Sequence, residues 1–192
     1  GGENLIAVAP GANHDTAAAD VPDAALGPGT LLVCQMEVPA AETAAVIRRA
    51  RAAGSRILLN LAPALPLDPL LLAEIDLLVA NRGEAGGLGG DPADLGGTLR
   101  QALVVTNGAE GATAYLADGG VIAVPALDIA AVDTTGAGDT FVGVLAAGLD
   151  QGLALEPALR RASAAGGLAC LAQGAQTAIP DRASIESAVA RP

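Results

Sequence analysis

One stretch, residues 131–141 with the sequence AVDTTGAGDTF, constrains the fold of this chain more than any other. A β-friendly run, Leu127–Val132, leads into it, and an apolar pattern with helical spacing follows. Small residues in its middle let three backbone N–H groups converge, those of Gly136, Ala137 and Gly138. Unpaired donors and the positive end of the helix dipole favour an anion at such a helix start. The stretch therefore predicts a strand, an anion-binding turn and a helix.

An acidic residue, Asp139, lies one position beyond this turn. A carboxylate held beside a bound phosphoryl group is placed to take a proton from an attacking hydroxyl. The alternative is a plain strand–helix turn in which Asp139 complements the helix dipole, because short Gly-x-Gly motifs are common. The spacing alone leaves both interpretations open.

The composition limits the partners of the protein. Its 192 residues fit one domain, whose core must be aliphatic because the chain has one Tyr, one Phe and no Trp. A formal net charge of −11 argues against binding to nucleic acid, which needs a basic surface. An acidic protein that handles nucleotide phosphates would need a divalent cation and backbone amides to offset the repulsion.

Cysteine usage and hydropathy indicate a cytoplasmic protein. Cys34 and Cys170 stand alone in apolar runs without metal-binding or redox spacing, so both are expected to be buried free thiols. No signal-peptide pattern opens the chain, and no apolar run reaches the roughly 18 residues that span a bilayer, so no membrane partner is expected. The chain begins at once on a strand-like run, Leu5–Ala9, as the middle of a larger protein would. His14 lies in a polar loop, and we expect it to be solvated.

Strand-like and helix-like runs alternate along the chain. The expected strands are Leu31–Met36 (apolar enough to be buried on both faces), Arg56–Leu61, Ile75–Ala80 and Ala102–Thr106, followed by a hairpin of Ala112–Ala117 and Val121–Val124. The expected helices are Pro39–Ala53, Leu155–Leu171 and a last one capped by Ser184, with weak helical character in Ala17–Leu26 and in the glycine-dense Gly86–Gly97. This alternation predicts βαβ units and a mostly parallel sheet.

Polar residues gather where the expected strands end. They are Glu37, Asn60, Asn81, Glu84, Thr106 and Asp133. Ligands of parallel sheets bind at the carboxyl ends of the strands, so six polar residues along one edge indicate a site. The glycine turn Thr106–Gly111 suits close approach by a ligand, or merely a hairpin.

Taken together, these motifs resemble the PfkB-type carbohydrate kinase family, and within it the C-terminal part of the ribokinases. The resemblance covers essentially all 192 positions. It is carried by GEN-I-V-PGAN (Gly2–Asn13), Gln35-Met36-Glu37, Asn60-x-Ala62-Pro63-Ala64, Asn81-x-x-Glu84, Thr106-x-Gly108-x-x-Gly111 and AVDTTGAGDTF. The last motif together with Asn-x-x-Glu is highly specific to the family. The early GEN and PGAN pieces favour ribokinase over fructokinase or adenosine kinase with less specificity.

The resemblance implies a fold and a reaction. The fold would be α/β, a three-layer α/β/α domain over residues 1–192 with a mostly parallel central sheet, truncated at the N-terminus. The reaction would transfer the ATP γ-phosphoryl group to a sugar hydroxyl, the 5-hydroxyl of ribose in ribokinase. Another sugar or nucleoside kinase of the family is the closest rival.

The resemblance also implies roles for individual residues. Asp139 would be the general base, and Gly136, Ala137 and Gly138 would form the anion hole. The nucleotide would contact Asn81, Thr106, Asn107, Gly108, Ala109, Glu110, Gly111, Gly138, Asp139 and Ser163, the last at the adenine pocket. Glu37 and Asp139 would contact the sugar. Glu84 would hold Mg²⁺ through water, unless it is only a solvated acid at a helix start.

A monovalent cation is implied as well. K⁺ would be held largely by backbone carbonyls of Asp133, Thr135, Ala169, Ala172, Gly174 and Ala178, and it would order the anion hole. The expected cofactors are therefore ATP, Mg²⁺ and K⁺. The full-length protein is expected to be a homodimer.

The sequence departs from the family pattern in two places. The N-terminal part of the family, with a sugar-binding Asp and the lid that mediates dimers, has no counterpart, and the segment between Glu84 and Thr106 is short and rich in glycine. Without that part the sugar would lose contacts and its shield from water, and the sheet would expose an edge. Three interpretations stay open: a fragment of a full kinase, a remnant with reduced activity, or a non-catalytic nucleotide-binding module.

Overall fold

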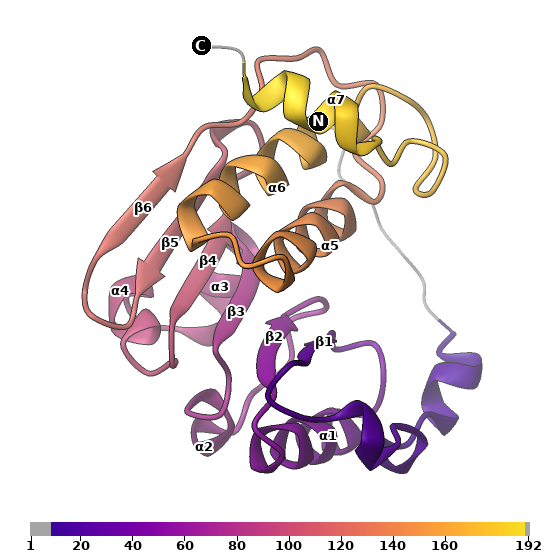
Figure 1. Ribbon diagram of the computed structural model, residues 1–192, viewed down its shortest axis with the longest axis vertical. Coiled ribbons are helices and arrows are strands. Elements are labelled where there is room, and N and C mark those ends of the chain that lie inside the picture. Colours follow the sequence, from indigo (N-terminus) through magenta and orange to yellow (C-terminus); the bar gives the residue numbers. More distant parts are fainter. Residues whose placement is uncertain (1–8, 191–192) are drawn as a thin grey trace.

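The structure, a computed structural model, describes residues 9–190 and is built on one sheet of six strands (Figure 1). In spatial and chain order these are β1 Leu31–Cys34, β2 Arg56–Asn60, β3 Leu77–Asn81, β4 Ala102–Thr106, β5 Ala112–Leu116 and β6 Val121–Val124. Strands β1 to β4 run parallel, and the hairpin β5–β6 continues the sheet with antiparallel pairing. The predicted α/β class is confirmed. The expected strand Leu5–Ala9 lies outside the described residues except for its last position.

Helices cover both faces of the sheet. They are α1 Ala40–Ala52, α2 Pro69–Leu72, α3 Arg82–Leu88, α4 Pro92–Gly96, α5 Ala137–Asp150, α6 Leu155–Ala169 and α7 Arg182–Val189. Side chains of α5 and α6 pack on one face, and those of α1, α2 and α3 on the other. Helix α7 lies against α6, outside the sheet (Figure 1). The result is the expected three-layer α/β/α sandwich.

Alternation along the strands explains why both faces are covered. In β2, Leu58 contacts the cluster of α5 and α6, whereas its neighbours Ile57 and Leu59 join the cluster on the opposite face. Successive side chains of a strand point to opposite faces, so an unbroken apolar run requires cover on both. The core is aliphatic, as the composition predicts, with Phe141 its single buried aromatic side chain among the described residues.

Strand β1 differs from the prediction of a strand buried on both faces. It is shorter than Leu31–Met36, it forms the edge of the sheet, and its residues are half-buried or exposed, with Val33 44% exposed. In the described part of the chain β1 pairs only with β2, so its other side is open and its apolar side chains are not fully buried. The apolar sequence of this strand therefore predicted more burial than the structure shows.

The run Leu127–Val132 is not a strand, although its composition favours one. Pro125 follows β6, and the chain then leaves the sheet and passes α6 and α7 on its way to α5 (Figure 1). The Val132 N–H donates to the carbonyl oxygen of Cys170 at 2.8 Å instead of to a neighbouring strand. β-propensity depends on packing against neighbouring strands, and this run has none beside it among the described residues.

Smaller differences concern helix ends. The last helix is capped by Asp181, whose side chain accepts the Ser184 N–H, so Ser184 is the third residue of that helix and not its cap. The glycine-dense segment 86–97 holds the end of α3 and the whole of α4, each short. The region Ala17–Leu26 forms only 3₁₀ turns, Ala18–Asp20 and Asp23–Ala25. Helix α6 ends at Ala169, earlier than predicted.

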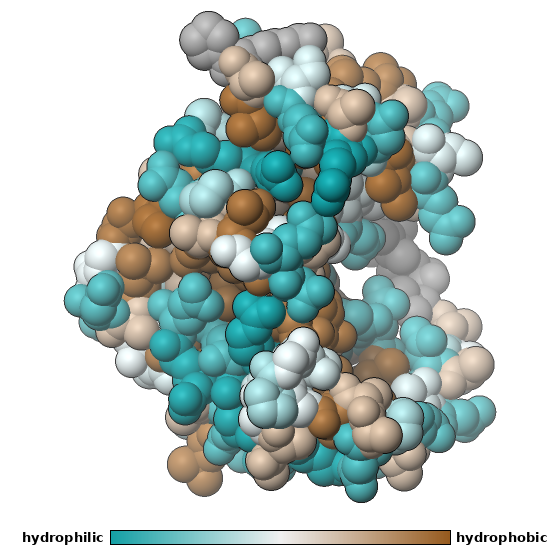
Figure 2. Space-filling model, viewed as in Figure 1, coloured by the Kyte–Doolittle hydropathy of each residue, from teal (hydrophilic) through white to brown (hydrophobic). Residues whose placement is uncertain are grey.

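The surface has apolar areas of modest size. Figure 2 shows hydrophobic residues exposed along the outer side of the β5–β6 hairpin, where Val121 is 59% exposed. Among residues 9–190, no helix is both long and apolar enough to cross a membrane.

Truncation of a core side chain should show how much the α5 face contributes to stability. Leu145 is fully buried between α5 and the sheet, so Leu145→Ala should lower the free energy of unfolding by about 2–5 kcal/mol. Leu70→Ala, at a residue 78% exposed, is the control and should change it by less than about 0.5 kcal/mol. Urea unfolding followed by circular dichroism measures both, and equal losses would contradict the packing described here.

Candidate active site

A glycine bends the turn before α5. Gly136 has φ +76°, a left-handed conformation, and a Cβ placed there would lie 3.0 Å from both the Cα and the carbonyl oxygen of Ala175. Glycine is the residue that tolerates both conditions. The turn 134–138 is therefore held closely against the loop that follows α6, and α5 begins directly after it at Ala137.

The start of α5 offers free backbone donors. The Ala137 N–H donates to the carbonyl oxygen of Thr134 at 3.2 Å, so it is used inside the turn. Within residues 9–190, the N–H groups of Gly136, Gly138 and Asp139 have no hydrogen-bond acceptor. Such donors at the positive end of a helix dipole form an anion site. Two of the three predicted donors are free in this structure, and the Asp139 N–H is a further one that the sequence analysis did not name.

The carboxylate of Asp139 is also free. The residue is exposed, and in the described part of the chain its side chain makes no hydrogen bond and no ion pair. A carboxylate whose lone pairs are unused can accept a proton from a hydroxyl that comes within hydrogen-bond distance. The geometry is thus compatible with the predicted general base, one residue beyond the anion site.

A second carboxylate, that of Asp133, fixes the turn. One oxygen accepts the Thr135 N–H at 3.0 Å, and the other accepts the Gly174 N–H at 3.1 Å. These hydrogen bonds, first of all those with Thr135, hold the pKa of Asp133 below its usual value because they stabilise the charged form. Asp133 therefore joins the turn before α5 to the loop after α6.

A cavity of about 440 Å³ lies beside the anion site. It is lined by Thr106, Gly108, Ala109, Gly111, Ala126, Leu127, Asp128, Ile129, Ala131, Thr134, Ala137, Gly138, Phe141, Ser163, Gly166, Gly167 and Cys170. The cavity brings together six of the ten residues predicted to bind a nucleotide. The other four, Asn81, Asn107, Glu110 and Asp139, lie outside its lining. Its volume falls in the range of small-molecule sites, about 300–1,000 Å³.

The turn after β4 is shaped by Gly111. This residue has φ +92°, and a Cβ there would come within 2.1 Å of the carbonyl oxygen of Val124, so no other residue fits. The Asn107 N–H donates to the Gly111 carbonyl oxygen at 2.8 Å and closes the turn around the short 3₁₀ helix Gly108–Glu110. The backbone of this turn lines the cavity, as the prediction of close approach by a ligand requires.

The Asn81–Glu84 motif forms the start of α3. The Asn81 side chain accepts the Glu84 N–H at 2.8 Å, and the Glu84 carboxylate accepts the Asn81 N–H at 2.7 Å, which is a capping box. Glu84 thus caps the helix and has one carboxylate oxygen left. Across residues 9–190 no group of three or more His, Cys, Asp or Glu side chains could hold a metal by itself. Mg²⁺ commonly keeps several waters and binds through one or two carboxylates plus phosphates, so Glu84 fits such a site.

Arg82, inside the same motif, is a contact that the sequence analysis missed. Its guanidinium donates to the Asn107 Oδ1 at 3.3 Å and forms an ion pair with Glu110. Both partners belong to the turn after β4, so Arg82 links the start of α3 to that turn. The signal was its position within Asn-x-x-Glu, between Asn81, a predicted nucleotide contact, and Glu84, the predicted Mg²⁺ residue.

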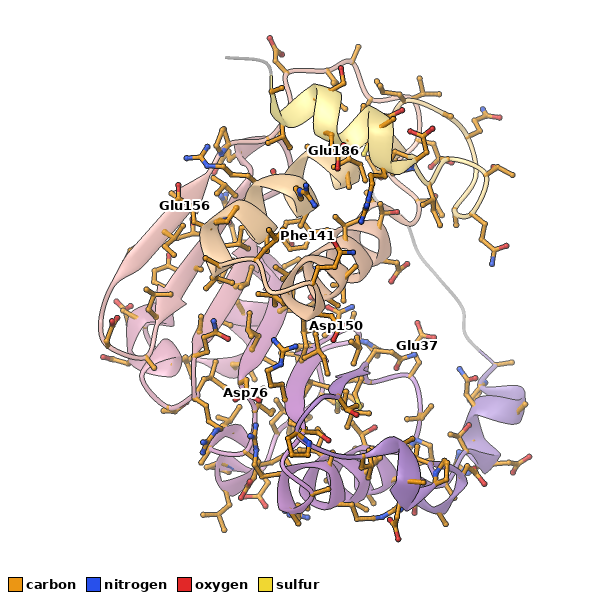
Figure 3. The ribbon with its side chains drawn as sticks, viewed as in Figure 1. Glu37, Asp76, Phe141, Asp150, Glu156 and Glu186 are labelled. Atoms are coloured by element: carbon orange, nitrogen blue, oxygen red, sulfur yellow. The ribbon has the colours of Figure 1, made fainter. Side chains whose placement is uncertain are left out.

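The predicted sugar contact Glu37 lies apart from the cavity. It follows the edge strand β1, is exposed, and stands at the right of the view in Figure 3, away from the α5–α6 packing around Phe141. At the same sheet edge, Asn81 and Thr106 are neighbours in the β3–β4 register. The carboxyl ends of the strands therefore share one side of the molecule, with Glu37 at its outer end.

Of the residues predicted to bind K⁺ with Asp133, Thr135 and Gly174 are in hydrogen-bond contact with it. Ala169 and Ala178 are buried, Ala172 is exposed, and Gly174 both donates to Asp133 and accepts the Ala178 N–H at 3.3 Å. A carboxylate oxygen has more than one acceptor site, so Asp133 can bind an N–H and still coordinate a cation. The donor set, one carboxylate and several carbonyls, fits a monovalent cation. Ala178 adds no side-chain oxygen.

The cysteines and the histidine behave largely as expected. Cys170 is buried and lines the cavity, and burial raises the pKa of its thiol, with a smaller effect from the Asp133 charge. Cys34 is half-buried rather than buried, and desolvation raises its pKa to about 11. His14 is exposed. Both thiols are therefore protonated and unreactive at neutral pH.

The sequence analysis also missed one wall of the cavity. Segment 126–131, most of which falls in the predicted strand Leu127–Val132, lines it together with the α6 glycines Gly166 and Gly167. A Cβ on Gly166 would lie 3.2 Å from the carbonyl oxygen of Ala137, and one on Gly167 would lie 3.2 Å from Leu127 Cβ. The adjacent glycines in an otherwise good helix sequence were the signal of a close contact.

The depressed pKa of Asp133 gives a prediction about stability and pH. Because its folded-state pKa lies below the ordinary value, the ionised side chain stabilises the fold at neutral pH, and this contribution is lost as pH falls through the folded-state pKa. The difference in urea midpoint between the wild type and Asp133→Asn should be constant from pH 7 to 5 and should shrink below about pH 4. Asp15→Asn, at an exposed residue without a side-chain contact in the described part of the chain, should give no such difference. A difference for Asp133→Asn that persists undiminished at pH 2.5 would contradict the assignment.

Comparison with known proteins agrees with the resemblance drawn from the motifs. The ribokinase of Schizosaccharomyces pombe is 31% identical over 201 residues, and the alignment covers 96% of this chain and 63% of that protein. Ribokinase from Thermotoga maritima has a similar structure, with a TM-score of 0.87 at 25% identity over 99% of this chain and 66% of that one. Arabidopsis thaliana ribokinase complexed with ribose and ATP gives a TM-score of 0.78 at 28% identity over 84% of this chain and 56% of that one.

This chain is shorter than the relatives that it matches. The chain spans a little less than two thirds of the relatives that it matches, while almost all of it is matched. The sequence also matches the family described as pfkB family carbohydrate kinase over residues 1–182. Since that match extends over nearly the whole sequence, the chain belongs to the pfkB family of carbohydrate kinases.

Proposed function

We propose that this chain carries the nucleotide-binding and catalytic half of an ATP-dependent sugar kinase, with ribose as the first substrate to test. The observation that carries the proposal is the start of α5. There, free N–H groups, an unpaired carboxylate and a 440 Å³ cavity adjoin one another. Phosphoryl transfer needs positioning and charge stabilisation above all, and this arrangement supplies both.

Each part of the site has a proposed role. The N–H groups of Gly136 and Gly138, with that of Ala137 after it leaves Thr134, would stabilise charge on the transferred group. The Asp139 carboxylate would take the proton from the sugar hydroxyl. The cavity between the turn 106–111 and α6 would hold the nucleotide, with Asn81, Asn107 and Glu110 at its outer end.

Metal ions would supply the charge that an acidic protein lacks. With a formal net charge of −11, the chain has few cations of its own to offset a triphosphate, and Mg²⁺ would neutralise part of that charge. The free oxygen of Glu84 would hold it through water. K⁺ would be held by Asp133, Thr135 and the carbonyls of the loop after α6, where Asp133 already orders the turn.

The identity of the sugar rests on relatives. Ribose is proposed because the Arabidopsis structure holds ribose and ATP, and because Glu37 occupies the position of a predicted sugar-contacting carboxylate. Another sugar or nucleoside kinase of the family is the alternative. A homodimer of the longer protein and a cytoplasmic location remain predictions.

The general base can be tested by one substitution. Asp139→Asn should lower turnover by about 10²–10⁴-fold, with the affinity for Mg-ATP nearly unchanged, because the amide keeps the shape and cannot take the proton. The assay follows ATP-dependent phosphorylation of ribose, in the chain and in a longer version that includes the rest of the family domain, beside calorimetric titration with Mg-ATP. Asp118→Asn, in the remote β5–β6 turn, is the control. A loss of less than tenfold would show that Asp139 is not the base.

The same assay examines the non-catalytic alternative. We expect the 192-residue chain to bind Mg-ATP weakly and to phosphorylate ribose slowly, because it spans about 63% of the S. pombe ribokinase and the resemblance places sugar contacts in the N-terminal part that it does not cover. Tight Mg-ATP binding with no transfer to any sugar, even in the longer version, would favour a nucleotide-binding module.

The proposed cation site makes a separate prediction. Potassium should raise the initial rate, because a cation between Asp133 and the loop after α6 preorganises the N–H donors of the turn. Sodium should do so less well, since the carbonyl set suits the larger ion. The measurement is rate against KCl at constant ionic strength, made up with a bulky organic cation. A flat response would remove the cation from the proposal and leave the phosphoryl transfer standing.

A further inference from the structure

The connection between β6 and α5, residues Pro125–Val132 and here named the strap, is fastened to α6 at both ends. At one end the Ser163 hydroxyl donates to the carbonyl oxygen of Pro125 at 2.7 Å. At the other end the Val132 N–H donates to the carbonyl oxygen of Cys170 at 2.8 Å. Figure 1 shows this connection passing α6 before it reaches α5. Both anchors belong to α6 or to its C-terminal cap.

The middle of the strap rests on α6 through close packing. Leu127 lies against Gly167, where an added Cβ would come within 3.2 Å of Leu127 Cβ. Ser163, Gly167 and Cys170 are four and three residues apart, so they share one face of the helix. Within residues 9–190, the backbone of 126–131 makes no hydrogen bond to another backbone group. The strap thus has contacts with α6 in place of strand pairing.

The strap also separates two open spaces. Its residues Ala126–Ile129 line the 440 Å³ cavity beside the anion site, and they also line a groove of about 860 Å³ against α6 and α7. Because the same residues border both spaces, the strap packs on α6 between them. Its position, and hence the width of the cavity, depends on the contacts with α6.

From these contacts we infer that Ser163 is a positioning residue. It holds the strap in place, and the strap forms the wall of the cavity that contacts the bound nucleotide. The inference rests on the proposed function. Ser163 is buried, its hydroxyl proton is given to Pro125, and its Cα lies on the helix that forms the opposite wall. Ser163 therefore acts on the nucleotide through the strap rather than by donating a hydrogen bond to it.

The first test needs no nucleotide. Asp128 is exposed, so a protease that cleaves before aspartate can cut the Leu127–Asp128 bond, and mass spectrometry can follow the fragment that starts at Asp128. Ser163→Ala should speed this cut severalfold, and Ser163→Thr, which keeps the hydroxyl, should restore the wild-type rate. Thr43→Val is the control, because Thr43 lies in α1 on the other face of the sheet and its buried hydroxyl has no hydrogen-bond partner among residues 9–190.

The second test measures nucleotide binding. The dissociation constant of Mg-ADP, by calorimetry on the whole chain, should rise about fivefold in Ser163→Ala, the size expected for one lost hydrogen bond. Mg-ADP should also slow the cut before Asp128 in the wild type. Gly167→Ala, which presses on Leu127, should weaken binding too, whereas Gly143→Ala, a helical glycine with open space around it, should not.

Each outcome decides one step. An unchanged cut in Ser163→Ala would overturn the role of Ser163 in holding the strap. A faster cut with an unchanged Mg-ADP affinity would overturn the role of the strap in the nucleotide site, while the proposed function would stand. If the wild-type chain bound no nucleotide, the proposed function and the nucleotide step would both fail, and the protease test would still decide whether Ser163 holds the strap.

Discussion

The hydrogen bonds of one carboxylate, that of Asp133, hold the candidate site together. They join positions 41 residues apart in the sequence, the turn before α5 and the loop after α6. Gly136 packs against Ala175 of the same loop, so a second contact joins the turn to this loop. These contacts fix the turn, and within residues 9–190 the N–H groups of Gly136, Gly138 and Asp139 stay without an acceptor and can face an anion. The sheet and the helices position this junction, which holds the residues of the candidate site.

The acidity of the chain and its anion site are compatible for a physical reason. A site built from backbone N–H groups needs no basic side chain, and it works at the end of a helix whatever the surface charge. In the described part of the chain, Arg82, a cation that contacts the turn 106–111, is itself paired with Glu110. A nucleotide that entered would therefore meet dipoles first, and metal ions would supply the remaining charge.

Sequence reasoning predicted those features that depend on local pattern. The parallel strands, the glycine turn 106–111 and the helix that begins within 131–141 follow from apolar runs and from glycines, which tolerate the left-handed backbone of tight turns. It failed where the outcome depended on a distant partner. Leu127–Val132 has the composition of a strand, yet it lies on α6 because no strand is beside it. Two local contacts were missed as well: Asp181, three residues before Ser184, caps α7, and the Ala137 N–H donates to the Thr134 carbonyl oxygen within the turn.

Two adjacent glycines of α6 set the width of the cavity, which substitutions at these positions would change. Gly166 faces the carbonyl oxygen of Ala137 at the start of α5, and Gly167 faces Leu127 in the strap, so neighbouring positions of one helix meet opposite walls. A methyl group at either position would narrow the pocket from a different side. If the cavity holds the base of the nucleotide as proposed, paired libraries at these two positions could select for smaller or larger bases without altering the residues of the anion site.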